Sequence, residues 1–148
     1  MASNPEPVAF LPASHHGDWK GDNRLWVMDP DKPFRSKGTA RIAADKIAYT
    51  WEHEAKGHSG EIVLIGQPAA LRAEWTDSWH AKETMTFHGC LCQGRLTLYG
   101  TYPAGEGIEW GWQIEIDVQD SESLFLRMRN VMPGHEPVPA VIFHGRRA

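Results

Sequence analysis

The segment from Trp75 to His80, Trp-Thr-Asp-Ser-Trp-His, gathers the side chains best suited to chemistry in this chain. Asp77 and His80 stand three residues apart, so the carboxylate can orient the imidazole for ligand binding or for acid–base catalysis. The same carboxylate can instead accept hydrogen bonds from the backbone of the following turn and cap it. The sequence leaves both interpretations open.

A second candidate is His53, which alternates with Tyr49 and Trp51 while Glu52 and Glu54 fall between them. In a strand, alternate side chains share one face, so an inward face would place His53 in the interior or at its rim. A buried histidine must find a hydrogen-bond partner or stay neutral. His53 is therefore either a satisfied core residue or a residue that contacts a ligand.

Other reactive residues give weaker patterns. His88, Cys90 and Cys92 alternate on one strand face, but zinc sites need three or four ligands with wider gaps between paired cysteines. We therefore expect packing thiols and no metal site. Ser78 lacks the flanking glycines of a nucleophile elbow, and no glycine-rich phosphate loop is present.

The elements that position these residues are strands. Residues 107–118, GIEWGWQIEIDV, alternate between apolar and polar side chains, which is typical of a half-buried antiparallel strand. The same rhythm predicts ten strands, at roughly 18–28, 38–44, 46–55, 59–66, 71–76, 84–90, 95–102, 108–118, 123–131 and 138–145. Short turn sequences, among them KGHSG at 56–60, join them into hairpins.

A meander with one apolar face covers that face and removes its edges by rolling up. We therefore predict an all-β fold, a single closed up-and-down barrel of ten strands with almost no helix. Large side chains are expected to fill much of its interior. The expected inward residues are Trp19, Leu25, Val27, Tyr49, Trp51, His53, Ile62, Leu64, Trp75, Leu96, Leu98, Tyr102, Trp110, Trp112, Ile114, Leu124, Leu126, Met128 and Asn130.

Composition narrows the class of protein. The chain has 148 residues, enough for one domain, which we divide into an irregular lead-in over 1–16 and a barrel over 17–148. A formal charge of -4 without a basic patch argues against nucleic acid. No apolar run is long enough for a membrane span, and the first residues carry no export signal. Two cysteines make no disulfide framework, so we expect a cytoplasmic protein.

Gly17-Asp18-Trp19 resembles the Gly-x-Trp signature of the lipocalin and wider calycin group. The resemblance implies that Trp19 closes the barrel base under Arg146 or Arg147. A bacterial lipocalin-like family known only as a domain of unknown function is similar over residues 17–147. This similarity rests on Arg24-Leu25-Trp26, Tyr49-x-Trp51, Ile65-Gly66 through Glu74–His80, Trp110-Gly111-Trp112 and Met128-Arg129-Asn130. It implies the fold and no settled activity.

The main functional hypothesis is a binding module that holds a small apolar or aromatic molecule in its lumen or at one rim. The expected ligand-binding residues are Tyr49, Trp51, His53, Trp75, Asp77, His80 and Trp112, without a cofactor. One alternative is an enzyme on the same barrel. It would use His53, His80 and Asp77 for acid–base chemistry, or haem on His144, because the related nitrobindin type of barrel holds haem iron through a late-strand histidine. The other is a structural or self-associating protein with a filled barrel. A homodimer also stays open.

Overall fold

The computed structural model describes residues 10–27 and 29–148, and over these residues it contains ten strands and one short 3-10 helix, η1 (Ala13–His15). The strands largely follow the predicted period-two pattern, which places alternate side chains on opposite faces, with irregularities in the register between Trp75 and Asp77 and between Pro139 and Val141. The strands are β1 (Gly17–Leu25), β2 (Phe34–Ile42), β3 (Lys46–His53), β4 (Lys56–Gln67), β5 (Ala70–Asp77), β6 (Ala81–Cys92), β7 (Arg95–Pro103), β8 (Glu109–Asp117), β9 (Leu124–Val131) and β10 (Val138–Arg147).

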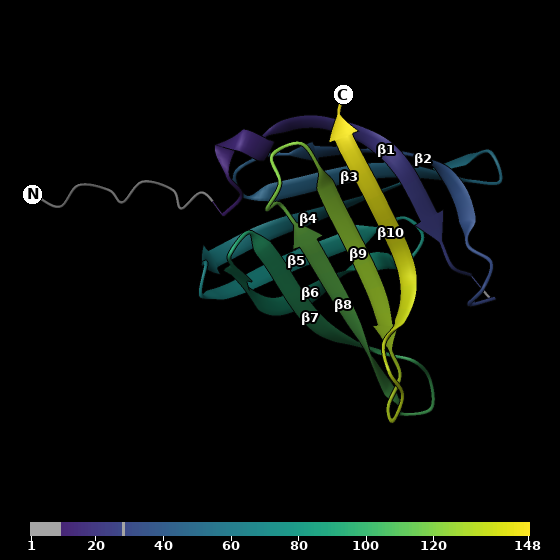
Figure 1. Ribbon diagram of the computed structural model, residues 1–148. Coiled ribbons are helices and arrows are strands. Elements are labelled where there is room, and N and C mark those ends of the chain that lie inside the picture. The colour runs from purple at the N-terminus through teal and green to yellow at the C-terminus, as the bar shows by residue number, and fades with distance from the viewer. Residues whose placement is uncertain (1–9, 28) are drawn as a thin grey trace, which may run out of the picture.

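The strands form a closed barrel in which each strand pairs antiparallel with its sequence neighbours and β1 pairs with β10 (Figure 1). The all-β closed barrel predicted from the sequence is confirmed. Because the strands alternate in direction, the ends of β1, β3, β5, β7 and β9 lie at one end of the barrel. We call this the histidine end, for the residues described below, and the opposite end the sealed end.

The largest differences from the predicted boundaries lie at the hairpins. β2 begins at Phe34 rather than at 38, and the turn between β3 and β4 is not KGHSG at 56–60. His53 pairs with Lys56, so the turn is Glu54-Ala55, with φ of 51° and 62°. Both residues adopt the left-handed conformation of a type I′ turn, which normally requires Asn or Gly. This turn chemistry could not be recognised in the sequence.

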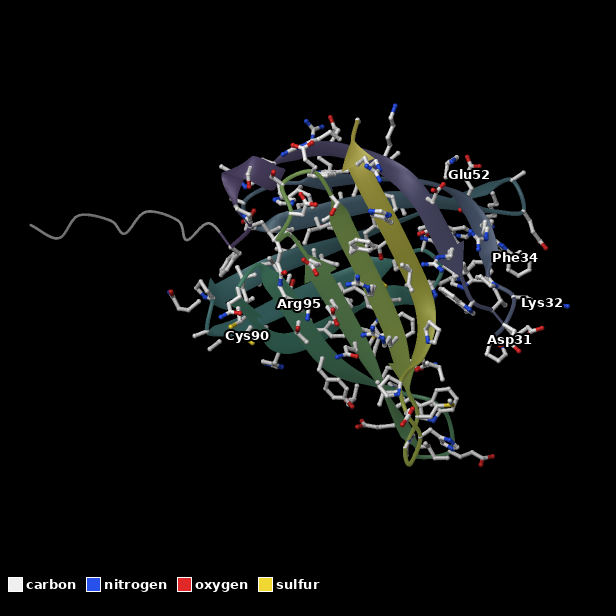
Figure 2. The ribbon with its side chains drawn as sticks, in the orientation of Figure 1. Asp31, Lys32, Phe34, Glu52, Cys90 and Arg95 are labelled. Atoms are coloured by element: carbon white, nitrogen blue, oxygen red, sulfur yellow. The ribbon has the colours of Figure 1, made fainter. Side chains whose placement is uncertain are left out.

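The expected inward residues are buried or half-buried, with one exception. Val27 lies beyond the end of β1 and is 44% exposed. The face that carries His88, Cys90 and Cys92 points outward, and all three residues are exposed. The prediction of packing thiols was therefore wrong. Figure 2 shows Cys90 near the sealed end and Phe34 and Glu52 near the histidine end.

The sealed end is closed by the segment that precedes β1. The backbone N–H groups of Phe10 and Leu11 donate to the Ala44 carbonyl, both at 3.0 Å, and both side chains are buried. His15 stacks on Trp19 with ring centroids 5.2 Å apart. Its Nε2 atom donates to the carbonyls of Asp120 and Ser123, so this histidine is held by the loop between β8 and β9.

Trp19 is 1% exposed, and its indole N–H donates to the His15 carbonyl at 2.9 Å. The Arg147 guanidinium lies over the Trp19 ring, 4.4 Å from its centroid, and donates to the His16 carbonyl at 2.8 Å. Of the two arginines implied by the Gly-x-Trp resemblance, Arg147 is the one in contact. The start and end of the barrel are thus joined at one tryptophan. Residues 1–9 of the predicted lead-in lie outside the described residues.

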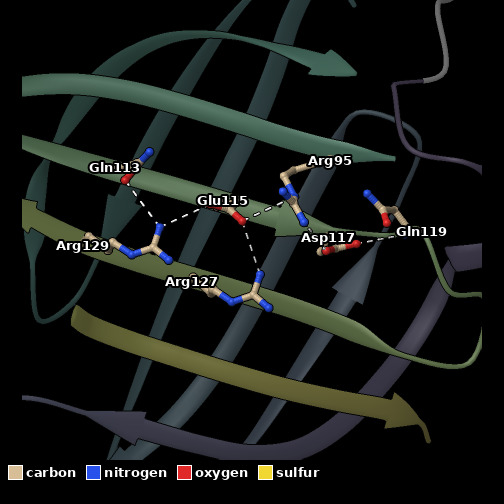
Figure 3. Close-up of polar contacts among 7 residues, drawn as sticks. All are labelled: Arg95, Gln113, Glu115, Asp117, Gln119, Arg127 and Arg129. Carbon is tan, nitrogen blue, oxygen red and sulfur yellow. Dashed lines mark hydrogen bonds and ion pairs between the residues drawn. The ribbon is translucent and has the colours of Figure 1, made fainter. Parts of the chain in front are cut away.

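The outer face of β7, β8 and β9 carries an ion-pair network centred on Glu115 (Figure 3). Its carboxylate lies 3.4 Å from Arg95 Nε, 3.4 Å from an Arg127 nitrogen and 3.2 Å from an Arg129 nitrogen. These residues are neighbours across the sheet, where opposite charges favour the pairing. The network supports the outer surface and does not contact the interior.

Candidate functional site

Histidines and tryptophans gather inside the histidine end. We call Trp51, His53, His58, Trp75, Trp79, His80 and Trp112 the histidine–tryptophan cluster. They come from the end of β3, the start of β4, the end of β5 with its following turn, and the start of β8. Antiparallel pairing brings these segments to one end of the barrel, and inward alternation turns their side chains toward one another.

Trp79 covers the cluster. It belongs to the turn between β5 and β6 and is 38% exposed, whereas Trp51 beneath it is 2% exposed. Ring centroids of Trp79 lie 5.7 Å from Trp51, 5.1 Å from His53 and 5.0 Å from His58, all edge-on. Below this cover, Trp51 stacks on His58 at 4.6 Å. Trp79 is therefore the most exposed ring of the cluster and packs edge-on against the more buried rings.

The deeper part of the cluster joins the remaining rings. Trp75 and Trp112 stack with centroids 5.3 Å apart. His80 lies 5.1 Å from Trp112 and 6.0 Å from Trp51, so it connects the two walls. Trp75 and Trp112 are 1% and 5% exposed, and the barrel beyond them is filled by aliphatic and aromatic core residues.

A buried hydrogen-bond chain positions the turn that carries His80. The Trp75 indole donates to the Tyr49 hydroxyl at 2.8 Å, and this hydroxyl donates to the Asp77 carboxylate at 2.5 Å. Asp77 also accepts the backbone N–H groups of Trp79 at 2.7 Å and His80 at 2.9 Å. The carboxylate therefore caps the turn, the first of the two roles considered above. His80 Nδ1 lies 3.4 Å from the same carboxylate, within ion-pair range but without hydrogen-bond alignment.

The surroundings of this hydrogen-bond chain shift the pKa values of both Tyr49 and Asp77. Burial, and then the negative charge of Asp77, raise the pKa of Tyr49 well above its ordinary value, so its hydroxyl stays protonated and donates. Burial alone would raise the pKa of Asp77. The imidazole of His80 beside the carboxylate, the hydrogen bond from Tyr49 and the backbone N–H of His80 together outweigh burial and lower the pKa of Asp77. Asp77 is thus a fixed anion whose oxygens are occupied by the structure.

Gly60 makes the Tyr49–Asp77 hydrogen bond possible. In the sheet register Tyr49 pairs with Gly60, and Gly60 pairs with Asp77. The tyrosine side chain therefore crosses the intervening strand at a position without a side chain. A Cβ atom at residue 60 would overlap the Tyr49 hydroxyl. A glycine inside a strand is otherwise unfavourable, so the close approach of Tyr49 accounts for it.

Polar atoms without partners are concentrated at this end. Among the described residues, the buried side-chain atoms that have no hydrogen-bond partner are Asn23 Nδ2, Ser36 Oγ, Trp51 Nε1, His53 Nδ1, His58 Nε2, His80 Nδ1 and Trp112 Nε1. We call these the orphaned atoms. Five of them belong to the histidine–tryptophan cluster. The other two, Asn23 and Ser36, are opposite each other in the register of β1 and β2. They occupy inward positions at the same barrel end.

Such atoms are costly. Leaving a buried donor or acceptor unsatisfied costs about 1–3 kcal/mol, and native proteins hold only a few such groups per hundred residues. Within the described chain, their concentration at one end makes the histidine end the candidate binding site.

The surroundings of His58 change its pKa. Burial, and then the positive charge of Lys56, lower its pKa below the ordinary value of 6.5. Its Nδ1 atom lies 3.1 Å from the Ser78 hydroxyl, which also accepts the Ser59 backbone N–H at 3.0 Å. His58 is therefore held in place at Nδ1 as a neutral imidazole at pH 7, with Nε2 among the orphaned atoms.

We expect His58 to make stability depend on pH below about 6.5. The folded pKa is the lower one, so the unfolded chain binds the proton first as pH falls. The stabilisation is complete above pH 6.5 and is lost as pH falls toward the folded pKa. Urea unfolding of the wild type and of His58→Gln at pH 7.5 and 5.5 measures this. The advantage of the wild type should shrink at pH 5.5, and a constant difference would contradict the expectation.

The structure brings all the sequence-predicted ligand residues to one end of the barrel, with Tyr49 and Asp77 supporting the turn from the side. His53 and His80 both lie near Trp79, with centroids at 5.1 and 6.4 Å. The sequence interpretation missed His58, because it placed residues 56–60 in a turn. A two-residue turn at 54–55 would have paired His58 with Trp51, as the structure does.

One concavity and His144 lie outside this site, whereas a smaller groove of about 360 Å³ is bordered by Trp51 and His58 of the cluster. A concavity of about 1010 Å³ lies against β1–β6, bordered by outward residues such as Lys20, Thr50 and Ser78 together with Tyr49 and Asp77, but not by His53 or His80. The cluster side chains contact one another directly and do not border that concavity. His144 points outward and stacks on Phe125 at 4.1 Å. It does not reach the interior, so a luminal haem on this residue is not supported.

Within residues 10–27 and 29–148, no group of three or more His, Cys, Asp or Glu side chains is arranged to hold a metal ion. In the same residues no helix has the length and apolar character needed to cross a membrane.

Comparison with known proteins does not assign the chain. No protein-family model matches it, and no curated protein matches it either. Over the described residues, fold and site define the class by themselves: a closed ten-stranded antiparallel barrel, sealed at one end by a tryptophan and an arginine and lined at the other by histidines and tryptophans.

Proposed function

We propose that this protein binds a small apolar or aromatic molecule at the histidine end, beneath Trp79. The observation that carries the proposal is the set of orphaned atoms among stacked aromatic rings. Small-molecule sites combine mostly apolar walls with a few polar groups that orient the ligand. Trp51 and Trp112 supply such walls, and His53, His58 and His80 supply polar atoms.

The depth of the site follows from packing. Trp75 and Trp112 are stacked and buried, and Phe87 packs behind Trp75 at 5.7 Å. This packing favours a ligand near the rim over one deep in the lumen, because a deep ligand would have to displace a filled core. It also supports the alternative of a structural barrel filled by its own aromatic residues. The packing and hydrogen bonds give less support to the acid–base enzyme, because the Asp77 carboxylate already accepts hydrogen bonds from three donors of the protein.

The Trp19–Arg147 contact supports a relation to the lipocalin-like group, because it is the arrangement that the Gly-x-Trp resemblance implies. It bears on the fold family and not on the ligand. We therefore base the proposed binding on the histidine–tryptophan cluster alone.

Ligand titration followed by tryptophan fluorescence tests the proposal. A panel of small aromatics and fatty acids should include at least one compound that quenches the wild type. Its affinity should fall by about 1–3 kcal/mol in His53→Ala and in His80→Ala, if each removes the partner of a buried ligand group. His88→Ala is the matched control, because His88 is exposed on the outer face of β6. Tight binding unaffected by either substitution would remove this site and leave only the barrel.

A second measurement tests the filled-barrel alternative. Native mass spectrometry of protein purified from its own host should show a retained molecule if the site is occupied in the cell. A measured mass equal to that of the polypeptide alone, together with no binding by any compound of the panel, would favour the filled barrel.

A further inference from the structure

The chemical kinds of the orphaned atoms restrict what the ligand can be. Indole N–H and amide NH₂ groups only donate hydrogen bonds, so Trp51 Nε1, Trp112 Nε1 and Asn23 Nδ2 require acceptors. The others, Ser36 Oγ and the histidine nitrogens, can donate or accept according to hydroxyl rotation or tautomer. Within the described residues, no orphaned atom is an acceptor only. The unmet demand at this end is therefore for acceptor atoms.

Two of these donors belong to the aromatic walls themselves. The ring centroids of Trp51 and Trp112 lie 6.0 and 5.1 Å from that of His80. The two tryptophans come from β3 and β8. The two tryptophans whose indole N–H groups are orphaned therefore both adjoin the His80 ring. The other core tryptophans differ, since Trp19 already donates to the His15 carbonyl and Trp75 to the Tyr49 hydroxyl.

Charge separates two kinds of acceptor. Asp77 is a buried carboxylate beside His80, and it accepts three hydrogen bonds from the protein. A second carboxylate brought next to it would be opposed by like-charge repulsion in a poorly solvated place. A neutral carbonyl oxygen supplies two acceptor lone pairs without that cost.

We infer that the ligand is an uncharged aromatic carbonyl compound, whose oxygen accepts hydrogen bonds from the indole N–H groups of Trp51 and Trp112. This inference rests on the proposed binding site and deepens it by naming the class of ligand. The carbonyl replaces the missing partners, and the aromatic body packs against the tryptophan rings beneath Trp79.

A matched set of probes tests the inference by calorimetric titration at pH 8. The set comprises 2-acetylnaphthalene, its isostere 2-isopropenylnaphthalene, in which a CH₂ group replaces the carbonyl oxygen, and the anion 2-naphthoate. We expect the ketone to bind about tenfold tighter than the isostere, and tighter than the anion. Trp51→Phe and Trp112→Phe keep a ring and delete the donor, so each should reduce that preference to about threefold or less.

A ¹H–¹⁵N spectrum of the wild type records the indole N–H signals directly. This measurement remains informative even if the Trp→Phe variants do not fold. The ketone should shift the Trp51 and Trp112 signals and leave Trp19 in place, because Trp19 is already bonded at the sealed end. The isostere should not produce the same downfield shift.

The outcomes separate the inference from the function on which it rests. Equal affinity for ketone and isostere, or tighter binding of 2-naphthoate, would overturn the carbonyl class and leave the binding site. Indole signals unmoved by bound ketone would do the same. If neither these probes nor the wider panel binds, the orphaned atoms hold only buried water, and both proposals fall.

Discussion

Replacing Trp19 with alanine should lower the free energy of unfolding by about 3–5 kcal/mol, the cost of truncating a large buried side chain. Trp19 is 1% exposed and lies between His15 and Arg147. The substitution removes its indole hydrogen bond and leaves a cavity where the preceding segment, β1 and β10 meet. Urea unfolding at pH 7 measures the loss.

Two variants separate the ring from its neighbours. Arg147→Ala should cost far less, about 0.5–2 kcal/mol, because it removes a cation–π contact and leaves the ring in place. Trp26→Ala is the control for tryptophan content, since Trp26 is only half-buried in the loop after β1. An unchanged melting temperature in Trp19→Ala would show that the Gly-x-Trp resemblance is accidental.

The second large effect concerns Asp77. Asp77→Ala leaves the Tyr49 hydroxyl and the backbone N–H groups of Trp79 and His80 without their acceptor. Each unsatisfied buried group costs about 1–3 kcal/mol, so we expect a total loss of about 3 kcal/mol or more at pH 7. The β5–β6 turn should loosen as well, which would raise the exposure of the cluster beneath Trp79.

Asp77→Asn distinguishes the charge from the hydrogen bonds. The amide keeps an acceptor oxygen. At pH 7, Asp77→Asn should therefore lower the free energy of unfolding by less than Asp77→Ala does. Because the folded pKa of Asp77 is lowered, its contribution is present above the unfolded value of about 3.9 and is lost as pH falls through the folded pKa. The wild type and Asp77→Asn should therefore converge in stability below about pH 4. Equal stabilities at pH 7 would contradict the role of the charge.

The sequence by itself determined the barrel. Period-two alternation, as in residues 107–118, depends only on the side chains of one strand, and short links force antiparallel neighbours. The shared barrel end of His53, Trp75 and His80 also follows from the alternating strand directions alone, and the structure places these residues there. Local pattern and topology therefore sufficed to place these three residues at the same end.

Only the tertiary structure decided how these residues meet. The Glu54-Ala55 turn lacks the usual Asn-Gly signal, so the pairing of Trp51 with His58 could not be read from the sequence. The place of Gly60 between Tyr49 and Asp77 depends on the register of three strands. The orphaned atoms depend on every neighbour within hydrogen-bond reach. Register and packing are set by long-range contacts, which a one-dimensional pattern does not contain.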